Sequence, residues 1–189
     1  MRVRSALVVV LLAAEVLGAT PASAGIAVVR NPGDPRYVVR LRSGQNGRVW
    51  SGTETVTFTN LEATPLSELW IRLWSNGVNG CGAQAIEATL TAGGTQEGAL
   101  AQHCTAMHVT LASPVAQGAD GSLSMDVRIA VPPKNDRFGY VDGLSYVGTA
   151  LPTLAIHDDD GWHVDPFIDI GESFYSIVGR YDVKVTGTR

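Results

Sequence analysis

The sequence predicts an all-β protein, and three observations lead to that prediction. Several segments alternate between apolar and polar residues with a period of two, as a strand with one buried face does, and VWSGTETVTFTN at 49–60 is the clearest. Clusters of glycine, asparagine and proline separate these segments, as turns separate strands. No long stretch shows the 3.6-residue period of an amphipathic helix. Several two-faced strands at this spacing are typical of an antiparallel or mixed β-sandwich.

Five segments are predicted to be strands. In chain order they are YVVRL at 37–41, VWSGTETVTFTN at 49–60, ELWIRLW at 68–74, SMDVRIAV at 124–131 and YDVKV at 181–185. The second carries threonine at most of its outward positions, which suits a solvated strand face.

The alternation also predicts which side chains point toward the core. The inward positions are Leu69, Ile71 and Leu73 in the third strand, Met125, Val127, Ile129 and Val131 in the fourth, and Tyr181, Val183 and Val185 in the fifth. Trp70, Arg72 and Trp74 occupy the opposite face of the third strand. Either both faces of that strand are buried, or a pair of aromatic rings is exposed as a binding platform.

The first 24 residues have the pattern of a signal peptide. Arg2 and Arg4 precede the apolar run 7–14, and Ala22-Ser23-Ala24 has the form of a signal peptidase site. The run is shorter than the roughly 20 residues that a membrane anchor needs. We therefore expect a secreted protein without a membrane anchor, in which residues 25–189 form a single β-sandwich domain.

The charge of the chain argues against nucleic acid as a partner. The formal net charge is −4 at pH 7, and no basic run is present. Binding to phosphate backbones depends on clustered lysine and arginine.

Cys81 and Cys104 are the two cysteines of the chain. In an exported protein an even pair predicts a disulfide. The alternative is a metal site made of both cysteines with His103 and His108. Adjacent His103 and Cys104 would point to opposite faces of a strand, which does not suit a shared metal.

Common catalytic motifs are absent. None of the four histidines is followed by glutamate, so the HExxH motif of zinc peptidases does not occur. In GESFY at 171–175, Tyr175 replaces the second glycine of a serine-hydrolase elbow. An EF-hand loop that places Gly161 at its sixth position would have Ile156 and Phe167 at its ends, so it lacks the terminal ligands.

HDDDGWHVD at 157–165 is predicted to be a hairpin whose chemistry depends on its loop length. A three-residue loop would set His157 opposite His163 with Asp165 on the same face, and these three residues could bind a metal. A two- or four-residue loop would place the histidines on opposite faces. The segment could also be a solvated turn in which aspartates bond nearby N–H groups, or a contact hairpin presenting Trp162 and His163 to a partner.

Three further stretches resemble a known family when they are taken in order. The combination is NDRFGY at 135–140, GWHVDP at 161–166 and GESFY at 171–175, supported by SGTETVTFTN and ELWIRLWSN earlier in the chain. It resembles the N-terminal β-domain of secreted bacterial zinc metallopeptidases of the aminopeptidase N family, over residues 33–186.

The resemblance implies a saddle-like, mostly β domain that packs on a thermolysin-like catalytic domain and helps to enclose a peptide cleft. The zinc ligands of the family lie in that later domain, so the resemblance places no cofactor in residues 1–189 and implies that this chain is a fragment, inactive alone. Family members hold the amine of the substrate with an acidic or amide side chain just before the position of Pro152. Residues 145–151 contain neither Glu nor Gln, so no such anchor is assigned.

A stand-alone secreted β-sandwich binding module is the alternative function. A domain built to pack on a catalytic partner would expose an apolar face when alone, so the first interpretation also predicts self-association or marginal stability.

Overall fold

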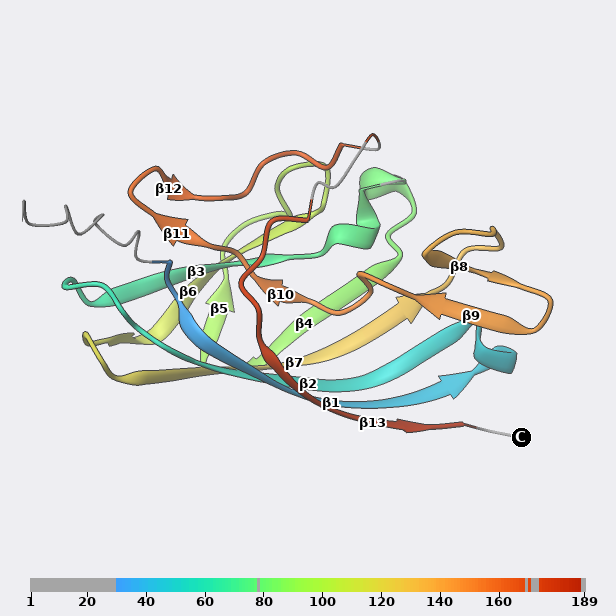
Figure 1. The fold of residues 1–189 in the computed structure, drawn as a ribbon, viewed down its shortest axis with the longest axis horizontal. Helices are drawn as coiled ribbons and strands as arrows, with labels where there is room; N and C mark the ends of the chain where they lie inside the picture. Colours follow the sequence, from blue (N-terminus) through green and yellow to red (C-terminus); the bar gives the residue numbers. More distant parts are fainter. Residues whose placement is uncertain (1–29, 78, 169, 171–173, 188–189) are drawn as a thin grey trace, which may run out of the picture.

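The computed structural model describes residues 30–77, 79–168, 170 and 174–187, so the predicted signal peptide at 1–24 lies outside the described residues. Within them the chain forms two facing β-sheets with two small hairpins (Figure 1). The prediction of an all-β sandwich with mixed and antiparallel sheets is confirmed. No described helix is long and apolar enough to span a membrane.

The larger sheet has five strands. In spatial order they are β13 (Arg180–Thr186), β1 (Gly33–Gly44), β2 (Val49–Thr59), β7 (Asp120–Ala130) and β4 (Ile86–Ala92). Neighbouring strands are antiparallel except β1 and β13, which run parallel. The sheet is therefore mixed, and its one parallel pair lies at its edge.

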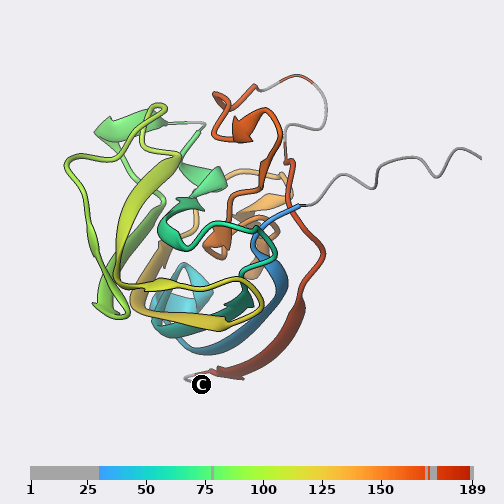
Figure 2. The same ribbon diagram turned by 90° about the vertical axis from the view of Figure 1, so that its left-hand side faces the viewer.

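The smaller sheet has four strands. In spatial order they are β10 (Thr153–Leu154), β3 (Leu66–Arg72), β6 (Ala106–Val115) and β5 (Gly94–Gln96). The two hairpins are β8 (Phe138–Val141) with β9 (Leu144–Val147), and β11 (His157–Asp158) with β12 (Gly161–Trp162). Short 3-10 turns are η1 (Gln45–Gly47), η2 (Trp74–Asn76) and η3 (Gly80–Gly82). Figure 2 shows the larger sheet curving beneath the smaller one.

The core lies between the two sheets. The inward positions predicted for the third and fourth strands are buried, since Leu69, Ile71 and Leu73 have at most 1% of their surface exposed, and Met125, Val127, Ile129 and Val131 at most 4%. Tyr37, Val39, Val56 and Phe58 extend this core across β1 and β2. Burying one such side chain stabilises the fold by roughly 1.5–3 kcal/mol.

One carboxyl group lies inside this core. Glu54 pairs with Val39 and Met125 across the sheet and is 1% exposed. Among the described residues, neither of its side-chain oxygens has a hydrogen-bond partner. Burial raises the pKa of Glu54 to about 8, so the carboxyl is mainly protonated at neutral pH.

Both faces of β3 are covered, which decides between the two alternatives for Trp70, Arg72 and Trp74. Arg72, on the face opposite the core residues, is fully buried, and Trp74, which follows the strand, is 4% exposed. Trp70 is partly buried and stacks on His108, with ring centroids 4.6 Å apart. The strand ends at Arg72 because the chain turns into η2 at Trp74.

The prediction for the last strand is wrong in one respect. Tyr181, Val183 and Val185 lie on the core side, beside Tyr37, Val39 and Leu41 of β1. They are nevertheless 45–52% exposed. These side chains are exposed because β13 is the outermost strand of the larger sheet and extends beyond the part of that sheet that the smaller sheet covers.

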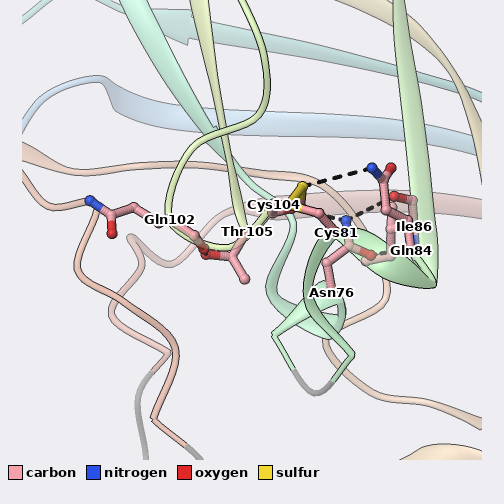
Figure 3. Close-up of a disulfide and its surroundings, with 7 residues drawn as sticks. All are labelled: Asn76, Cys81, Gln84, Ile86, Gln102, Cys104 and Thr105. Carbon is pink, nitrogen blue, oxygen red and sulfur yellow. Dashed lines mark hydrogen bonds between the residues drawn. A yellow bond between two sulfur atoms is a disulfide. The ribbon is translucent and has the colours of Figure 1, made fainter.

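The predicted disulfide between Cys81 and Cys104 is present, with the two Cα atoms 5.2 Å apart (Figure 3). The disulfide closes a loop that Asn76 also holds, at Ile86 within the loop and at Cys104 at its end. The Asn76 amide donates to the carbonyls of Ile86 and Cys104 at 2.9 and 3.0 Å, and its oxygen accepts from the Ile86 N–H at 2.7 Å. The alternative Cys/His metal site is not formed, because both thiols are consumed and His108 instead contacts Glu68 at 2.8 Å.

Candidate functional site

The hairpin at 157–165 has a two-residue loop. His157 pairs with Trp162 and Asp158 with Gly161, so Asp159 and Asp160 form the turn. Asp158 accepts a bond from the Asp160 N–H at 3.1 Å, as an aspartate before a turn does. The alternative with a three-residue loop, in which His157 faces His163, is therefore not the one found.

His157 is held by residues from two other segments, Asn31 before β1 and Glu62 between β2 and β3. Its Nδ1 atom bonds a carboxylate oxygen of Glu62, and its main chain exchanges two hydrogen bonds of 2.7 and 2.8 Å with Asn31. The Trp162 ring packs beside it, with centroids 4.9 Å apart. The histidine thus joins the hairpin to the segment before β1.

His163 contacts a different set of groups. Its Nε2 atom lies 2.8 Å from Asp158 Oδ1, its Nδ1 atom lies 3.9 Å from Asp165 Oδ2, and its ring meets the Tyr175 ring edge-on at 4.9 Å. The hydrogen bond from His163 lowers the pKa of Asp158, and the Asp160 N–H adds to this effect. The Asp158 carboxyl group is therefore ionised at neutral pH.

Arg72 lies beneath the hairpin and supports its continuation. The guanidinium donates to the carbonyls of Asp165 and His163 at 2.8 and 3.5 Å. It also lies 3.8 Å from the centroid of the Trp74 ring, a cation–π contact. Burial lowers the pKa of Arg72 to about 10, and the Asp165 charge opposes that shift, so the side chain remains positively charged at neutral pH.

The geometry does not bring the metal candidates His157, His163 and Asp165 together as a set. Each histidine has its own carboxylate, Glu62 for His157 and Asp158 for His163. Among the described residues, no group of three or more His, Cys, Asp or Glu side chains is arranged to hold a metal ion.

The contact hairpin expected from the sequence is only partly displayed. Trp162 is half-buried and packs against the hydrophobic core. His163 keeps 24% of its side chain exposed and is occupied by Asp158 and Tyr175. Both rings therefore face neighbouring parts of the chain as much as solvent.

A cavity of about 170 Å³ lies beside η2 and is lined in part by Trp74. Its lining combines aromatic rings, hydroxyl groups and charges, from Trp74, Ser75, Lys134, Asp136, Arg137, Phe138, Thr149, Phe167, Ile168 and Phe174. An engineered apolar cavity of about 150 Å³ is large enough for benzene. The space therefore suits one side chain or one ring of a ligand.

The aromatic wall of this cavity is built by mutual ring contacts. Phe174 meets Trp74 edge-on at 5.4 Å and lies 6.1 Å from Phe167. Phe167 in turn covers Gly77, where a Cβ atom would come within 2.1 Å of the phenyl ring. Glycine at position 77 is therefore what allows the phenylalanine to reach the cavity.

The charged rim of the cavity comes from the segment before β8. Lys134 Nζ lies 3.0 Å from Asp136 Oδ2, and the Arg137 N–H donates to Asp136 Oδ1 at 2.6 Å. The Lys134 hydrogen bond is the main cause of the lowered pKa of Asp136. The Arg137 guanidinium lies 5.3 Å from the centroid of the Phe174 ring. Two cations and one anion therefore surround the opening.

Two of the motifs that carry the family resemblance, and the residue that follows the third, line this cavity. Asp136, Arg137 and Phe138 come from NDRFGY, Phe167 directly follows GWHVDP, and Phe174 belongs to GESFY. Inside NDRFGY, Gly139 passes so close to the Lys134 carbonyl that a Cβ atom would lie 2.0 Å from its oxygen. The sequence analysis used these motifs as landmarks and missed the cavity, because no local pattern indicates that segments 30 residues apart share a pocket.

Comparison with known proteins finds similar solved structures among M1 zinc metallopeptidases. A point mutant of the enzyme from Deinococcus radiodurans, bound to a Tyr-Ser-Ala substrate, is 20% identical with a TM-score of 0.44, over 64% of this chain and 28% of that one. A mutant two-domain M1 zinc metallopeptidase bound to L-tryptophan is 20% identical with a TM-score of 0.37, over 55% of this chain and 22% of that one.

The chain thus spans about a quarter of the length of the structures that it resembles. No protein-family profile matches the chain. No curated protein matches it either.

Proposed function

We propose that residues 25–189 are the non-catalytic N-terminal β-domain of a secreted zinc aminopeptidase-like metallopeptidase, and that they form one wall of a peptide cleft. The observation that carries the proposal is that NDRFGY, Phe167 directly after GWHVDP, and Phe174 of GESFY line a single cavity. Motifs that only stabilised a sandwich would have no reason to meet at an opening. Aromatic rings beside Arg137 and Lys134 offer a surface for a peptide side chain and for a carboxylate.

The proposal assigns catalysis to a domain outside residues 1–189. The sequence has no HExxH motif, and the described residues hold no cluster of metal ligands. Zinc bound in the catalytic domain would polarise the peptide carbonyl and activate water. The contribution of this chain is to bind and orient the substrate against that domain.

Exposed apolar side chains between residues 168 and 178, of which Ile168 lines the cavity, support a partner on this side. Ile168, Ile170 and Val178 are 58%, 89% and 93% exposed. Solvent contact with large aliphatic groups is unfavourable, and a grouped set of them often marks a protein interface. A catalytic domain seated here would cover these residues and close the cavity into a cleft.

The test begins with the DNA downstream of codon 189. A reading frame or frameshifted remnant encoding HExxH is expected, and its catalytic domain can be expressed separately and mixed with residues 25–189. We expect binding in isothermal titration, weakened at least about tenfold by Ile170→Asp with Val178→Asp. Val38→Asp, an exposed valine on β1, is the matched control and should leave binding unchanged.

Two results would oppose the proposal. Chelator-sensitive hydrolysis of aminoacyl-anilides by residues 25–189 alone would contradict a non-catalytic role. A downstream sequence without any trace of HExxH would favour the stand-alone secreted binding module.

A further inference from the structure

The outer face of the larger sheet carries a concentration of positive charge that is dispersed in the sequence. Arg36, Arg40 and Arg42 lie on the outward face of β1 together with the exposed Val38, while the alternate residues Tyr37, Val39 and Leu41 are buried. Arg180 and Lys184 lie on β13, directly beside Arg36 and Arg40 in the parallel register. Five cations thus share two adjacent strands at the lower edge of the molecule (Figure 1).

Two acidic side chains of these strands lie beside the five cations, Asp34 next to Arg36 at the start of β1 and Asp182 in the middle of the region. The two carboxylate oxygens of Asp182 accept hydrogen bonds from the two terminal nitrogens of Arg40, at 3.2 and 3.0 Å. This pair holds the Arg40 side chain across the two strands. The whole chain has a net charge of −4. A basic region on an acidic protein indicates that charge is segregated, and such a region attracts anions selectively.

Within this region the surface is hollowed. The hollow, of about 340 Å³, is lined by Arg40, Arg42 and Lys184 together with the hydroxyl groups of Ser51, Thr53 and Thr186. Guanidinium and ammonium groups beside hydroxyl donors are the usual partners of sulfate and phosphate oxygens. Side chains two residues apart on a strand are about 6.8 Å apart, so the arginines of β1 form a row that one extended chain could follow.

We infer that the outer face of β13 and β1 binds a polysaccharide that carries sulfate or phosphate groups. Hydroxyl-bearing side chains of β2, at the outward positions 51, 53, 55 and 57, continue the face beyond the cations and suit sugar hydroxyls. The described outward residues of β13, β1 and β2 include no aromatic ring on which nucleotide bases could stack. The inference does not depend on the proposed function, because it concerns the opposite side of the sheet from the cavity.

The test uses a heparin fragment as the sulfated probe and measures its affinity for residues 25–189 between 50 and 200 mM salt. The patch variant is Arg42→Gln with Lys184→Gln, which leaves the Arg40–Asp182 pair intact. The matched control is Arg48→Gln with Lys134→Gln, which removes the same charge from the turn before β2 and from the segment before β8. We expect the patch variant to weaken binding on the order of tenfold and to lower the salt slope by about 2, with a change below about twofold for the control.

Several outcomes would overturn the inference. Equal losses of affinity for the patch variant and the control would show that the effect depends on net charge alone. Absence of heparin binding at 50 mM salt would also contradict the inference. So would tighter binding to duplex DNA or to anionic phospholipid vesicles than to the heparin fragment. Tighter binding to a phosphorylated than to a sulfated polysaccharide would support the inference and identify the anionic group. None of these results bears on whether a catalytic domain binds at the cavity, so failure here and failure of the proposed function are distinguishable.

Discussion

The guanidinium of Arg72 lies 3.8 Å from the centroid of the Trp74 ring and donates to the Asp165 carbonyl on its other side. One buried cation therefore joins three parts of the molecule, namely β3, the continuation of the 157–165 hairpin and the cavity wall. A buried charge is tolerated only when neighbouring groups replace its hydration. Here two carbonyl oxygens and an aromatic face do so for part of the guanidinium, while among the described residues the Arg72 Nε atom has no hydrogen-bond partner.

Replacing Arg72 should destabilise the protein strongly. In Arg72→Met the side chain still fills the space, but the carbonyls of His163 and Asp165 lose their donor, and we expect the free energy of unfolding to fall by about 2–4 kcal/mol. Urea unfolding followed by tryptophan fluorescence measures this. Arg128→Met, at an exposed pair with Glu87, is the control and should change stability by less than about 0.5 kcal/mol. Equal stability of the two variants would show that Arg72 does not hold the hairpin.

Glu54 should make the protein less stable as pH rises. Its pKa in the fold is about 8, above the ordinary value of 4.5. The stabilisation is therefore complete below about pH 4.5 and is lost as pH rises through 8, because the unfolded chain releases a proton that the folded chain retains. The acids whose pKa is lowered, such as Asp158 and Asp182, act in the opposite sense at more acid pH.

Comparison with Glu54→Gln isolates this effect. Relative to that variant, the native protein should lose on the order of 3 kcal/mol of unfolding free energy between pH 5 and pH 8. Denaturant unfolding at several pH values gives the difference directly. Parallel pH profiles for the two proteins would mean that Glu54 is ionised in the fold.

Removing the disulfide should weaken the fold without changing it. Cys81 and Cys104 are 23 residues apart, and a loop of this length is expected to contribute about 3 kcal/mol through the entropy of the unfolded chain. The double variant Cys81→Ala with Cys104→Ala should have a lower thermal midpoint, by the amount that corresponds to this loss of unfolding free energy. Reducing agent should shift the native protein to the same midpoint and leave the double variant unaffected, and a shift in both would point to another cause.

Self-association should depend on β13. Its apolar residues overhang the sandwich, and among the described residues no strand pairs with its outer edge, so the edge is open to another strand. Val183→Lys should reduce the concentration-dependent mass in sedimentation, since a charge on an edge strand opposes pairing. Val38→Lys on β1 should not. A native protein that stays monomeric at millimolar concentration would contradict this prediction.

Zinc and calcium should not bind at micromolar concentration to residues 25–189. His157 and His163 are engaged by Glu62 and Asp158 and do not share a face of the hairpin. Isothermal titration measures this directly. Micromolar binding that disappears in His163→Ala would show that the pairs rearrange around a metal, and it would restore the metal interpretation of the segment.

Much of the fold follows from local pattern. Alternation along 68–74 and 124–131 is enough to identify Leu69, Ile71, Met125 and Ile129 as core, because a strand directs every second side chain to the same face. The same logic could not decide the hairpin at 157–165. A change of one residue in loop length reverses which side chains face each other, and the turn residues Asp159, Asp160 and Gly161 suit more than one length.

The sequence by itself determined the all-β class, the inward faces of the main strands and the pairing of Cys81 with Cys104. Only the tertiary structure decided that Tyr181 and Val183 stay exposed, that distant arginines line up beside Lys184, and that NDRFGY, Phe167 and Phe174 meet at one cavity. The division has a physical reason. Local periodicity specifies which side chains share a face, whereas the order of strands in a sheet, set by contacts between distant residues, specifies what covers that face.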